Sequence, residues 1–346
     1  MKLSIITINY NNAEGLKKTL ASVASQTYRD IEHIIVDGGS TDGSVDVIKE
    51  YVYNVEGVKE LTNEGIQVVW TSEPDKGIYN AMNKGIEIAL GRRIVNSFNR
   101  SELVEDKNKG IEIALGRRVV NENHTSLIKH QTSEGSTPYT LHHTPSLSDY
   151  IQILNSGDLL ASPDVTERMM DALYTLHHTP YTDDALGIIY GNMIKKDYTT
   201  GKIIGKSREV EYSLRQYFSS TMNHDCCYFR RDLFETYGLY DENLKIVSDW
   251  KWFLQAIGLG HVKPVYVDID VTIFDASGIS ETNLALRNQE RRQVLEELLP
   301  PSILADYDNY AFPTTQIDRL KKYHLWPLVY FIERVLFKLN KWHILR

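Results

Sequence analysis

Several features that define common classes of protein are missing from this sequence. Its 346 residues contain only two cysteines, Cys226 and Cys227, and because these are adjacent they cannot join distant segments with ordinary disulfide geometry. The formal net charge of −8 argues against general nucleic-acid binding. With no signal peptide recognisable at Met1 to Leu3, we expect a reducing, cytoplasmic compartment.

The two standard glycine motifs for phosphate binding are also absent. The first predicted βα turn, Tyr10 to Glu14, lacks the glycines of GxGxxG, which disfavours a dinucleotide oxidoreductase. The glycine-rich segment DGGSTDGS, residues 37–44, is neither GxGxxG nor a P-loop. Asp37 at its start suits hydrogen bonding to ribose hydroxyls or a base N–H, because a carboxylate repels phosphate. A tight strand-to-helix turn without a ligand is the alternative.

Strands and helices alternate through the first third of the chain. Residues Leu3 to Asn9, Ile31 to Val36 and Ile66 to Trp70 are apolar, β-branched runs, which are typical of strands covered on both faces. Amphipathic helical patterns lie between them, and Asn11 or Asn12 can cap the first. This alternation predicts parallel βαβ units in one large domain, or in one domain plus an appendage.

The stretch DYIQILNSGDLL, residues 149–160, contains a candidate metal ligand. Tyr150 to Leu154 is short enough for a buried strand, and the turn residues Asn155 to Asp158 end it. In open α/β sheets, ligands bind just beyond the carboxyl ends of the strands, which is where Asp158 would lie. The alternative is that Asp158 only caps the helix suggested by Pro163 to Leu176.

The region from Gly91 to Ser148 interrupts the pattern. The segment NKGIEIALGRR occurs at residues 83–93 and again at 108–118, and YTLHHTP occurs at 139–145 and at 174–180. Two exact repeats at different offsets do not make a solenoid. We therefore interpret residues 91–148, which include a polar stretch from Asn121 to Ser148, as a surface insertion. The paired histidines of YTLHHTP are poor zinc candidates, because adjacent histidines point in different directions and no cysteine accompanies them.

A later helix carries a candidate catalytic acid. Ser248 precedes Asp249 and the apolar residues Trp250, Phe253 and Leu254, which predicts a helix capped by the serine and anchored in the core. We therefore expect Asp249 at the exposed start of that helix.

The last predicted helix, Leu325 to Arg346, is amphipathic. Its apolar face carries Leu328, Ile332, Val335, Leu339 and Trp342, and its basic face carries Arg334, Lys338 and Lys341. Glu333 and Arg334 interrupt it too early for a membrane span. The pattern fits the surface of an anionic membrane, and packing against the rest of the protein is an equal alternative.

Taken together, six segments resemble the family 2 glycosyltransferases of bacterial polysaccharide synthesis, which have the GT-A fold. In chain order they are SIITINYNN, IIVDGGSTDGS, SEPDKGIYNAMNKGI, YIQILNSGD, HDCCYFRRDLFETYGLYDE and IVSDWKWFL. The resemblance covers most of residues 1–280. It implies an α/β fold with a Rossmann-like, mixed, mainly parallel sheet flanked by helices. The polar excursion at 91–148 and a helical tail at 281–346 with a basic amphipathic end would be additions to that domain.

The resemblance also implies roles for individual residues. Asp158 would match the metal-binding aspartate of the family's DxD motif, although Ser156 stands where its first carboxylate would be. Asp249 would match the catalytic base. His224 would face the acceptor or the diphosphate, with a core histidine as the alternative. The nucleotide of the sugar donor would be held by Thr7, Asn9, Tyr10, Asp37, Asp75, Lys76, Asn83 and Ser156.

The implied activity is inverting transfer of a sugar from a nucleotide-diphosphate donor, most commonly UDP, to a glycan or lipid-linked acceptor. A divalent cation, Mn²⁺ or Mg²⁺, would neutralise the leaving diphosphate, and a carboxylate would take the proton of the acceptor hydroxyl. The alternative is a catalytically impaired nucleotide-sugar-binding protein of the same fold. We expect no nucleic-acid partner. The expected location is cytoplasmic, with peripheral contact to the inner face of the cell membrane as an open alternative.

Overall fold

The structure is a computed structural model of the 346-residue chain. It describes residues 1–62, 65–93, 149–177, 186–197, 200–210, 212–275 and 283–344. The chain divides into two compact units, Met1–Arg287 and Asn288–Arg346, which we call the first and second units. The domain boundary predicted after residue 280 falls among residues 276–282, outside the described ranges.

Most of the predicted insertion also lies outside the described residues, from position 94 to 148. The same holds for three of the four paired histidines, His142, His143 and His178. The fourth, His177, has a structural partner, because its Nε2 lies 2.7 Å from the hydroxyl of Tyr150.

One sheet of the first unit contains every named strand of the described residues, in the order β3-β2-β1-β4-β8-β6-β9-β5, with β7 paired to β6. Its amino-terminal half is parallel and consists of β3 (Gln67–Ser72), β2 (Ile31–Asp37), β1 (Leu3–Asn9) and β4 (Tyr150–Asn155). The register aligns the carboxyl ends of these strands. Asn9 pairs with Asp37, Asp37 with Ser72, and Ile8 with Asn155. Polar side chains that are far apart in sequence therefore meet at one edge of the sheet.

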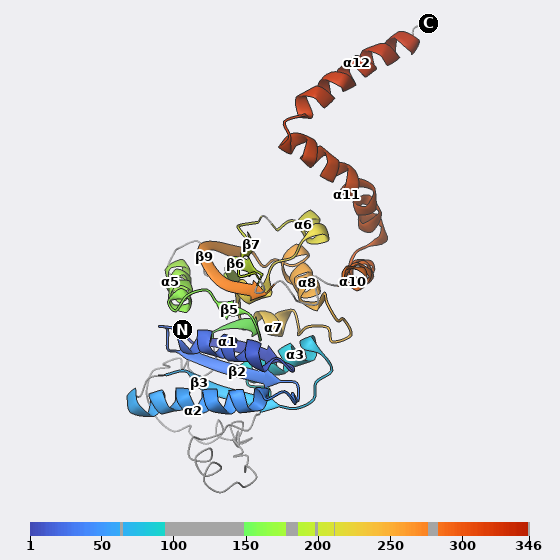
Figure 1. Ribbon diagram of the computed structural model, residues 1–346. Coiled ribbons are helices and arrows are strands. Elements are labelled where there is room, and N and C mark those ends of the chain that lie inside the picture. Colours follow the sequence, from blue (N-terminus) through green and yellow to red (C-terminus); the bar gives the residue numbers. More distant parts are fainter. Residues whose placement is uncertain are drawn as a thin grey trace, which may run out of the picture. The chain divides into compact units, whose positions relative to one another are not determined.

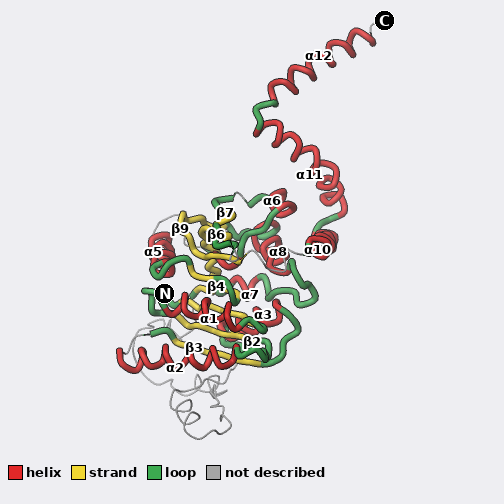
Figure 2. The backbone as a smooth tube through the Cα atoms, in the orientation of Figure 1, coloured by secondary structure: helices red, strands yellow, loops and turns green. Residues whose placement is uncertain are grey.

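The rest of the sheet is mixed. It consists of β5 (Leu159–Leu160), β6 (Ile188–Lys196), β7 (Ile203–Lys206), β8 (Cys227–Arg230) and β9 (Pro264–Asp275). The strand β8 runs antiparallel to β4 and β6, whereas β9 runs parallel to β6. The predicted α/β fold with a mixed sheet between helices is confirmed, and Figure 2 shows the strands lying among the helices.

Helices cover both faces of the parallel strands, which explains their continuous apolar sequences. They are α1 (Ala13–Ala24), α2 (Ser44–Thr62), α3 (Ile78–Ala89) and α5 (Val165–His177) (Figure 1). Leu3 and Ile5 belong to a core cluster that includes residues of α1, α2 and α5. Ile6 follows Ile5, so its side chain points to the opposite face of the strand, where it meets α3. A Cβ atom on Gly85 would lie 2.3 Å from Cγ2 of Ile6, so the glycine permits this close approach.

Short helices complete the first unit: α6 (Leu214–Ser219), the 3₁₀ turn η3 (His224–Cys226), α7 (Leu233–Thr236) and α8 (Ser248–Phe253), which continues as η4 (Leu254–Gly258). Trp250, Phe253 and Leu254 are buried, as predicted. The predicted capping role of Ser248 is wrong. Val247 occupies the N-cap position, and the Ser248 hydroxyl is buried without a hydrogen-bond partner in the described part of the chain.

Three helices form the carboxyl-terminal region. The helix α10 (Leu284–Leu298) spans the division between the units, and α11 (Pro301–Lys322) and α12 (Trp326–Ile344) lie in the second unit. None of the helices in the described ranges is long and apolar enough to cross a membrane.

Candidate active site

A cleft of about 430 Å³ opens at the carboxyl ends of β1 and β4. Its wall includes Asn9, Tyr10, Asn12, Asp75, Asn155, Ser156 and Asp158, together with the apolar residues Ile8, Ile78, Ala81 and Phe274. Five of the residues predicted to bind the donor or its metal are therefore brought together, namely Asn9, Tyr10, Asp75, Ser156 and Asp158. A cleft at this edge is the usual ligand position in an α/β sheet.

Asp37 organises the strand ends beneath the cleft. Its fully buried carboxylate accepts hydrogen bonds from the side-chain amide of Asn9 at 2.8 Å, the hydroxyl of Ser72 at 2.6 Å, and both the hydroxyl and the backbone N–H of Ser40 at 2.6 and 2.9 Å. We predicted that this carboxylate would contact a nucleotide. That role stays a prediction, and in the structure four internal donors bind the carboxylate and tie β1, β2 and β3 together at their ends.

The loops that follow β1 and β2 are joined to each other by reciprocal contacts. The backbone N–H of Asn11 donates to the Ser40 hydroxyl at 2.8 Å, and the Asn11 side chain accepts from the backbone N–H of Thr41 at 2.9 Å. Asn11 has a φ of 47°, a left-handed conformation that asparagine tolerates better than most residues. The backbone N–H of Ala13 donates to Asp42 at 2.8 Å. These contacts fix the positions of Asn9 and Tyr10 on the cleft wall.

Asp75 and Tyr10 flank a narrow gap beside Gly38. A Cβ atom on Gly38 would lie 2.4 Å from Oδ2 of Asp75 and 3.1 Å from Cδ2 of Tyr10. The other oxygen of Asp75 accepts a hydrogen bond from the backbone N–H of Gly77 at 2.9 Å, and the Tyr10 side chain is 65% exposed. The exposed ring can stack on a nucleotide base. The carboxylate beside it can accept a hydrogen bond from an N–H group of that base.

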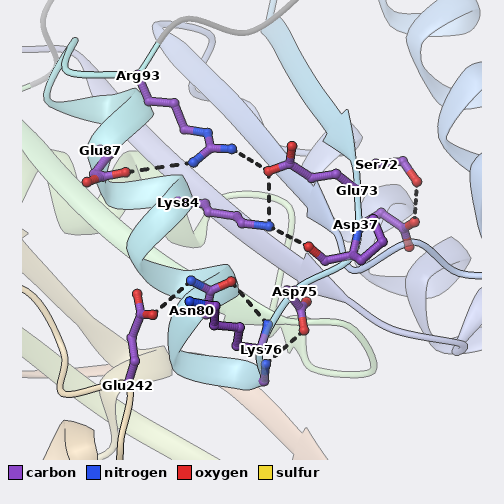
Figure 3. A network of polar contacts seen from close by, with 12 residues as sticks. Asp37, Ser72, Glu73, Asp75, Lys76, Asn80, Lys84, Glu87, Arg93 and Glu242 are labelled. Atoms are coloured by element: carbon purple, nitrogen blue, oxygen red, sulfur yellow. Dashed lines mark hydrogen bonds and ion pairs between the residues drawn. The ribbon is translucent and has the colours of Figure 1, made fainter.

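Figure 3 shows that Lys84, rather than Lys76, supports the loop after β3. The buried Lys84 ammonium group donates to the backbone carbonyl of Pro74 at 3.1 Å and forms an ion pair with Glu73 at 3.0 Å. Glu73 also pairs with Arg93. Lys76, which we predicted to bind the nucleotide, has an exposed side chain, and its backbone N–H donates to Asn80 at 3.2 Å.

The turn from Asn155 to Asp158 is held from α1. The side-chain amide of Asn12, the N-cap of α1, donates to the backbone carbonyl of Ser156 at 3.1 Å. Thr19 of α1 binds both sides of the turn, with its hydroxyl 2.8 Å from the Asp158 carbonyl and 2.9 Å from the donating N–H of Gly157. The Asp158 side chain is 4% exposed. The alternative that Asp158 caps the next helix is wrong, because β5 follows it directly and α5 begins only at Val165.

Asp249 is connected to the cleft wall through His224. Its Oδ2 lies 3.2 Å from Nδ1 of His224, whose Nε2 lies 3.3 Å from the side-chain amide of Asn155. The Tyr79 hydroxyl, from the first turn of α3, donates to Oδ1 of Asp249 at 2.9 Å. The side chains of His224 and Asp249 are each only 16% exposed, so the prediction of a solvent-exposed Asp249 is wrong.

Charges around the histidine favour an ion pair. Burial alone would lower the pKa of His224, but the hydrogen bond to Asp249 and the nearby charges of Asp249, Asp225 and Asp158 outweigh it and raise this pKa. Burial alone would likewise raise the pKa of Asp249, yet the contacts with His224 and Tyr79 lower it. The arrangement therefore keeps Asp249 ionised, as a proton acceptor must be.

Two further residues predicted to bind the nucleotide have internal partners. Thr7 is fully buried, with its hydroxyl 2.9 Å from Nε2 of His33. Asn83 is also buried and forms two hydrogen bonds with the backbone of Tyr240, donating to the carbonyl at 2.8 Å and accepting from the N–H at 2.9 Å. Asn83 thus attaches α3 to the loop before α8, so it helps to position the segment that carries Asp249.

Sequence reasoning missed Tyr79, Asn155 and Asn12 as parts of this site. Tyr79 shares the apolar face of α3 with Met82 and Ile86, so the sequence predicted a core aromatic residue. Asn155 and Asn12 have turn or capping roles that the sequence does show, but their second contacts depend on the alignment of β1 with β4.

Comparison with known proteins agrees with the geometry. Residues 4–97 match the family model described as "Glycosyl transferase family 2". An uncharacterized glycosyltransferase of Mycobacterium tuberculosis is 26% identical over 283 residues, which cover 80% of this chain and 76% of that protein. A PGL/p-HBAD biosynthesis glycosyltransferase of Mycobacterium bovis is 36% identical over 88 residues, 25% of this chain and 31% of that protein.

Two solved structures are similar at low sequence identity. TarS 1–349 of S. aureus in complex with UDP matches with a TM-score of 0.48 and 13% identity, covering 86% of this chain and 70% of that one. The mannosyltransferase PcManGT from Pyrobaculum calidifontis, in complex with GDP-Man and Mn²⁺, also has a TM-score of 0.48 and 13% identity, covering 86% and 63%.

The sequence relatives define the class of this protein, which is a glycosyltransferase enzyme. Residues 4–97 match the model of glycosyltransferase family 2, in agreement with the resemblance.

Proposed function

We propose that the protein is an inverting glycosyltransferase that moves a sugar from a UDP-sugar to a glycan or lipid-linked acceptor. The observation that carries the proposal is the linkage of two acids at one site. Asp158 lies in the cleft wall, and Asp249 is connected to that wall through His224 and Asn155.

The donor nucleotide would bind beside the interlocked loops. Tyr10 offers an exposed ring, and Asp75 offers a carboxylate that suits a base N–H or ribose hydroxyls. Asn9 and Ser156 line the same cleft, so the nucleotide would extend from Tyr10 toward the turn that carries Asp158.

Asp158 would hold a divalent cation together with the donor's phosphates. The described residues contain no group of three acids, histidines or cysteines that could bind a metal without the substrate. Mg²⁺ is commonly bound by one or two carboxylates, substrate phosphates and water, and a lone Asp158 fits this donor set. When bound, the cation would neutralise the charge of the leaving diphosphate.

Asp249 would act as the base toward the acceptor hydroxyl. A carboxylate held ionised by His224 and Tyr79 can accept a proton as the hydroxyl attacks the anomeric carbon. A single displacement with one base and no covalent intermediate inverts the anomeric configuration.

Ser156 favours a second candidate, a nucleotide-sugar-binding protein with impaired catalysis. Because Ser156 replaces a carboxylate of the motif, the cation has one anionic protein ligand fewer at this turn. Transfer or donor hydrolysis in the presence of Mn²⁺ would exclude this candidate, whereas tight donor binding without turnover would support it.

Thermal shift with a panel of nucleotides and nucleotide sugars, each with and without Mn²⁺, tests the proposal. We expect UDP and one UDP-sugar to raise the melting temperature, with a larger rise when Mn²⁺ is present. The proposal fails if no nucleotide stabilises the protein, or if Mn²⁺ leaves every shift unchanged.

Peripheral membrane contact is part of the proposal, and α12 would provide it. Eight large apolar residues between 325 and 337 are 39–70% exposed, namely Leu325, Leu328, Tyr330, Phe331, Ile332, Val335, Leu336 and Phe337. Arg334 and Lys338, one helical turn apart, add positive charge that complements an anionic leaflet. A helix of this kind would keep a cytoplasmic enzyme near a lipid-linked acceptor.

Vesicle flotation tests the membrane contact. We expect binding to vesicles with phosphatidylglycerol, little binding to pure phosphatidylcholine, and loss of binding in R334E/K338E. The matched control K17E/K18E makes the same charge change on exposed residues of α1. Equal losses in both double variants, or a change in oligomeric state without vesicle binding, would contradict the proposal.

A further inference from the structure

His224 has two polar partners from different parts of the fold. It lies in η3, immediately before β8, and its ring extends between Asn155 at the end of β4 and Asp249 at the start of α8. The ring therefore connects the strand that precedes the Asp158 turn with the helix that carries the proposed base.

The hydrogen bonds around Asn155 are compatible with a doubly protonated ring. As placed, the Asn155 amide nitrogen faces Nε2 of His224, and the buried Oδ1 of Asn155 has no partner among the described residues. The oxygen and nitrogen of an amide side chain are assigned from their hydrogen bonds. Rotating this amide by half a turn directs Oδ1 at Nε2 and moves the amide nitrogen to the position without a partner, so each orientation leaves one buried amide atom unpaired among the described residues. Both ring nitrogens then donate, Nδ1 to Asp249 and Nε2 to Asn155, and only an imidazolium can do this.

The surrounding charges agree with a cation. Asp249, Asp225 and Asp158 contribute negative charge from α8, from η3 itself and from the turn after β4. Asp225 is partly committed elsewhere, since its Oδ2 accepts from the Thr272 hydroxyl at 2.6 Å. On the far side of Asp249 lies the hydroxyl of Tyr79.

We propose that His224, as an imidazolium, is a positioning residue that holds the Asp249 carboxylate and fixes its distance from the Asp158 turn. The proposal rests on the proposed function, in which Asp249 is the base. The Tyr79 hydroxyl lies 2.9 Å from Oδ1 and Nδ1 of His224 lies 3.2 Å from Oδ2, so both carboxylate oxygens have polar partners and rotation of the carboxylate is restricted. Because His224 also binds the end of β4, movement of the base relative to the cleft is restricted.

The first test is kinetic and uses H224Q, in which an uncharged amide replaces the ring. We expect kcat to fall about 10- to 100-fold through loss of orientation, with the KM for the donor changed less than about twofold. Transfer declines at low pH as Asp249 becomes protonated. Loss of the neighbouring cation raises the pKa of Asp249, so this decline should begin at a higher pH in H224Q.

The control is H177Q, which removes a histidine that binds Tyr150 at the other end of β4. Its pH profile should match that of the unmodified protein. An unchanged kcat and profile in H224Q would overturn the proposal. So would a large rise in donor KM with an unmoved profile, because that result would place His224 on the diphosphate.

A second measurement needs no variant at position 224. Nitrogen chemical shifts of the histidine ring in the unmodified protein should show both nitrogens protonated near pH 7, and in D249N this state should be lost at a lower pH. A neutral His224 ring near pH 7 would contradict the proposal. Transfer retained in D249N would instead refute the proposed base, which keeps the two failures distinguishable.

Discussion

The two sides of the cleft are built in different ways. On one side, the loops after β1, β2 and β3 bind one another through Asp37, Ser40 and Asn11, whose side chains are occupied by internal partners. On the other side, the proposed chemistry would depend on single acids, Asp158 and Asp249, each on its own element. In the proposed function, the first arrangement would give a fixed wall for the donor, and the second would supply the metal ligand and the base.

This difference leads to a general expectation. Substitutions at positions of β1, β2 and β3 outside the cleft wall, or at residues packed on them, should change stability and leave the pH dependence of transfer unaffected. Substitutions on the side of Asp158 and Asp249 should change transfer with little loss of stability. The predictions below test this separation.

The largest effect is expected for D158N. Loss of the only carboxylate at this turn should abolish the Mn²⁺-dependent increase in UDP affinity and reduce transfer about 1,000-fold or more. Isothermal titration with UDP at several Mn²⁺ concentrations, together with transfer assays, measures both effects.

The control for D158N is D164N, which changes an aspartate just before α5 that accepts a hydrogen bond from the hydroxyl of Ser162. Transfer and Mn²⁺ dependence should be normal in this control. If D158N keeps its Mn²⁺ dependence, the cation is bound elsewhere.

A pH effect on stability is expected from His33, in the parallel half. Burial lowers the pKa of His33 to about 3 from the ordinary value of 6.5, so the unfolded chain binds a proton that the folded protein excludes. Above about pH 6.5, the free energy of unfolding is not reduced by protonation of His33. As the pH falls toward 3, the free energy of unfolding declines because of this group, by about several kcal/mol in total. Urea unfolding between pH 4 and pH 7.5 measures this slope.

In H33Q the slope should be smaller, although the protein should also be less stable at pH 7 through loss of the contacts with Thr7 and Tyr51. An unchanged slope in H33Q would show that another group is responsible.

A smaller loss of stability is expected for G85A. The added Cβ would lie 2.3 Å from Ile6, which should destabilise the first unit by about 1–3 kcal/mol despite the better helix propensity of alanine. The double variant I6A/G85A removes the contacting methyl group. A favourable coupling energy in the double-mutant cycle is therefore expected, and simple additivity would contradict this packing account.

The smallest effect is expected for Y79F, on the side of the base. The single hydrogen of this hydroxyl lies between two acceptors, Oδ1 of Asp249 at 2.9 Å and the carbonyl of Ile246 at 2.7 Å, and the variant removes this hydrogen bond from both. We expect a roughly tenfold lower kcat and a loss of about 1 kcal/mol in stability. The matched control is Y240F, because the Tyr240 hydroxyl is buried without a partner in the described ranges and its ring packs near Tyr79. Equal effects of the two variants would argue against a specific role for the Tyr79 hydroxyl.

The parallel half of the fold was predictable because its strands are covered on both faces. Continuous apolar runs such as Leu3 to Asn9 predict buried strands strongly. The order of the family motifs then predicted a ligand site near the strand ends and singled out Asp158 and Asp249. The predicted exposure of Asp249 was wrong, because a helix start usually faces solvent, whereas here α3 and η3 cover it.

The internal partners of the predicted ligands could not be inferred in the same way. Asp37 has the sequence context of a ligand, but its four donors come from β1, β3 and the following loop, which only the strand register brings together. Lys76 and Lys84 are equally basic in sequence. Their different roles follow from the path of the loop after β3, which passes beside the middle of α3.

The variant D249N tests the central claim most directly, when transfer and UDP binding are measured on the same preparation. The account predicts that transfer falls about 1,000-fold or more while UDP affinity in the presence of Mn²⁺ stays within about twofold of the unmodified protein. Retained transfer, or UDP binding lost together with transfer, would contradict the assignment of Asp249 as the base beside a separate donor cleft.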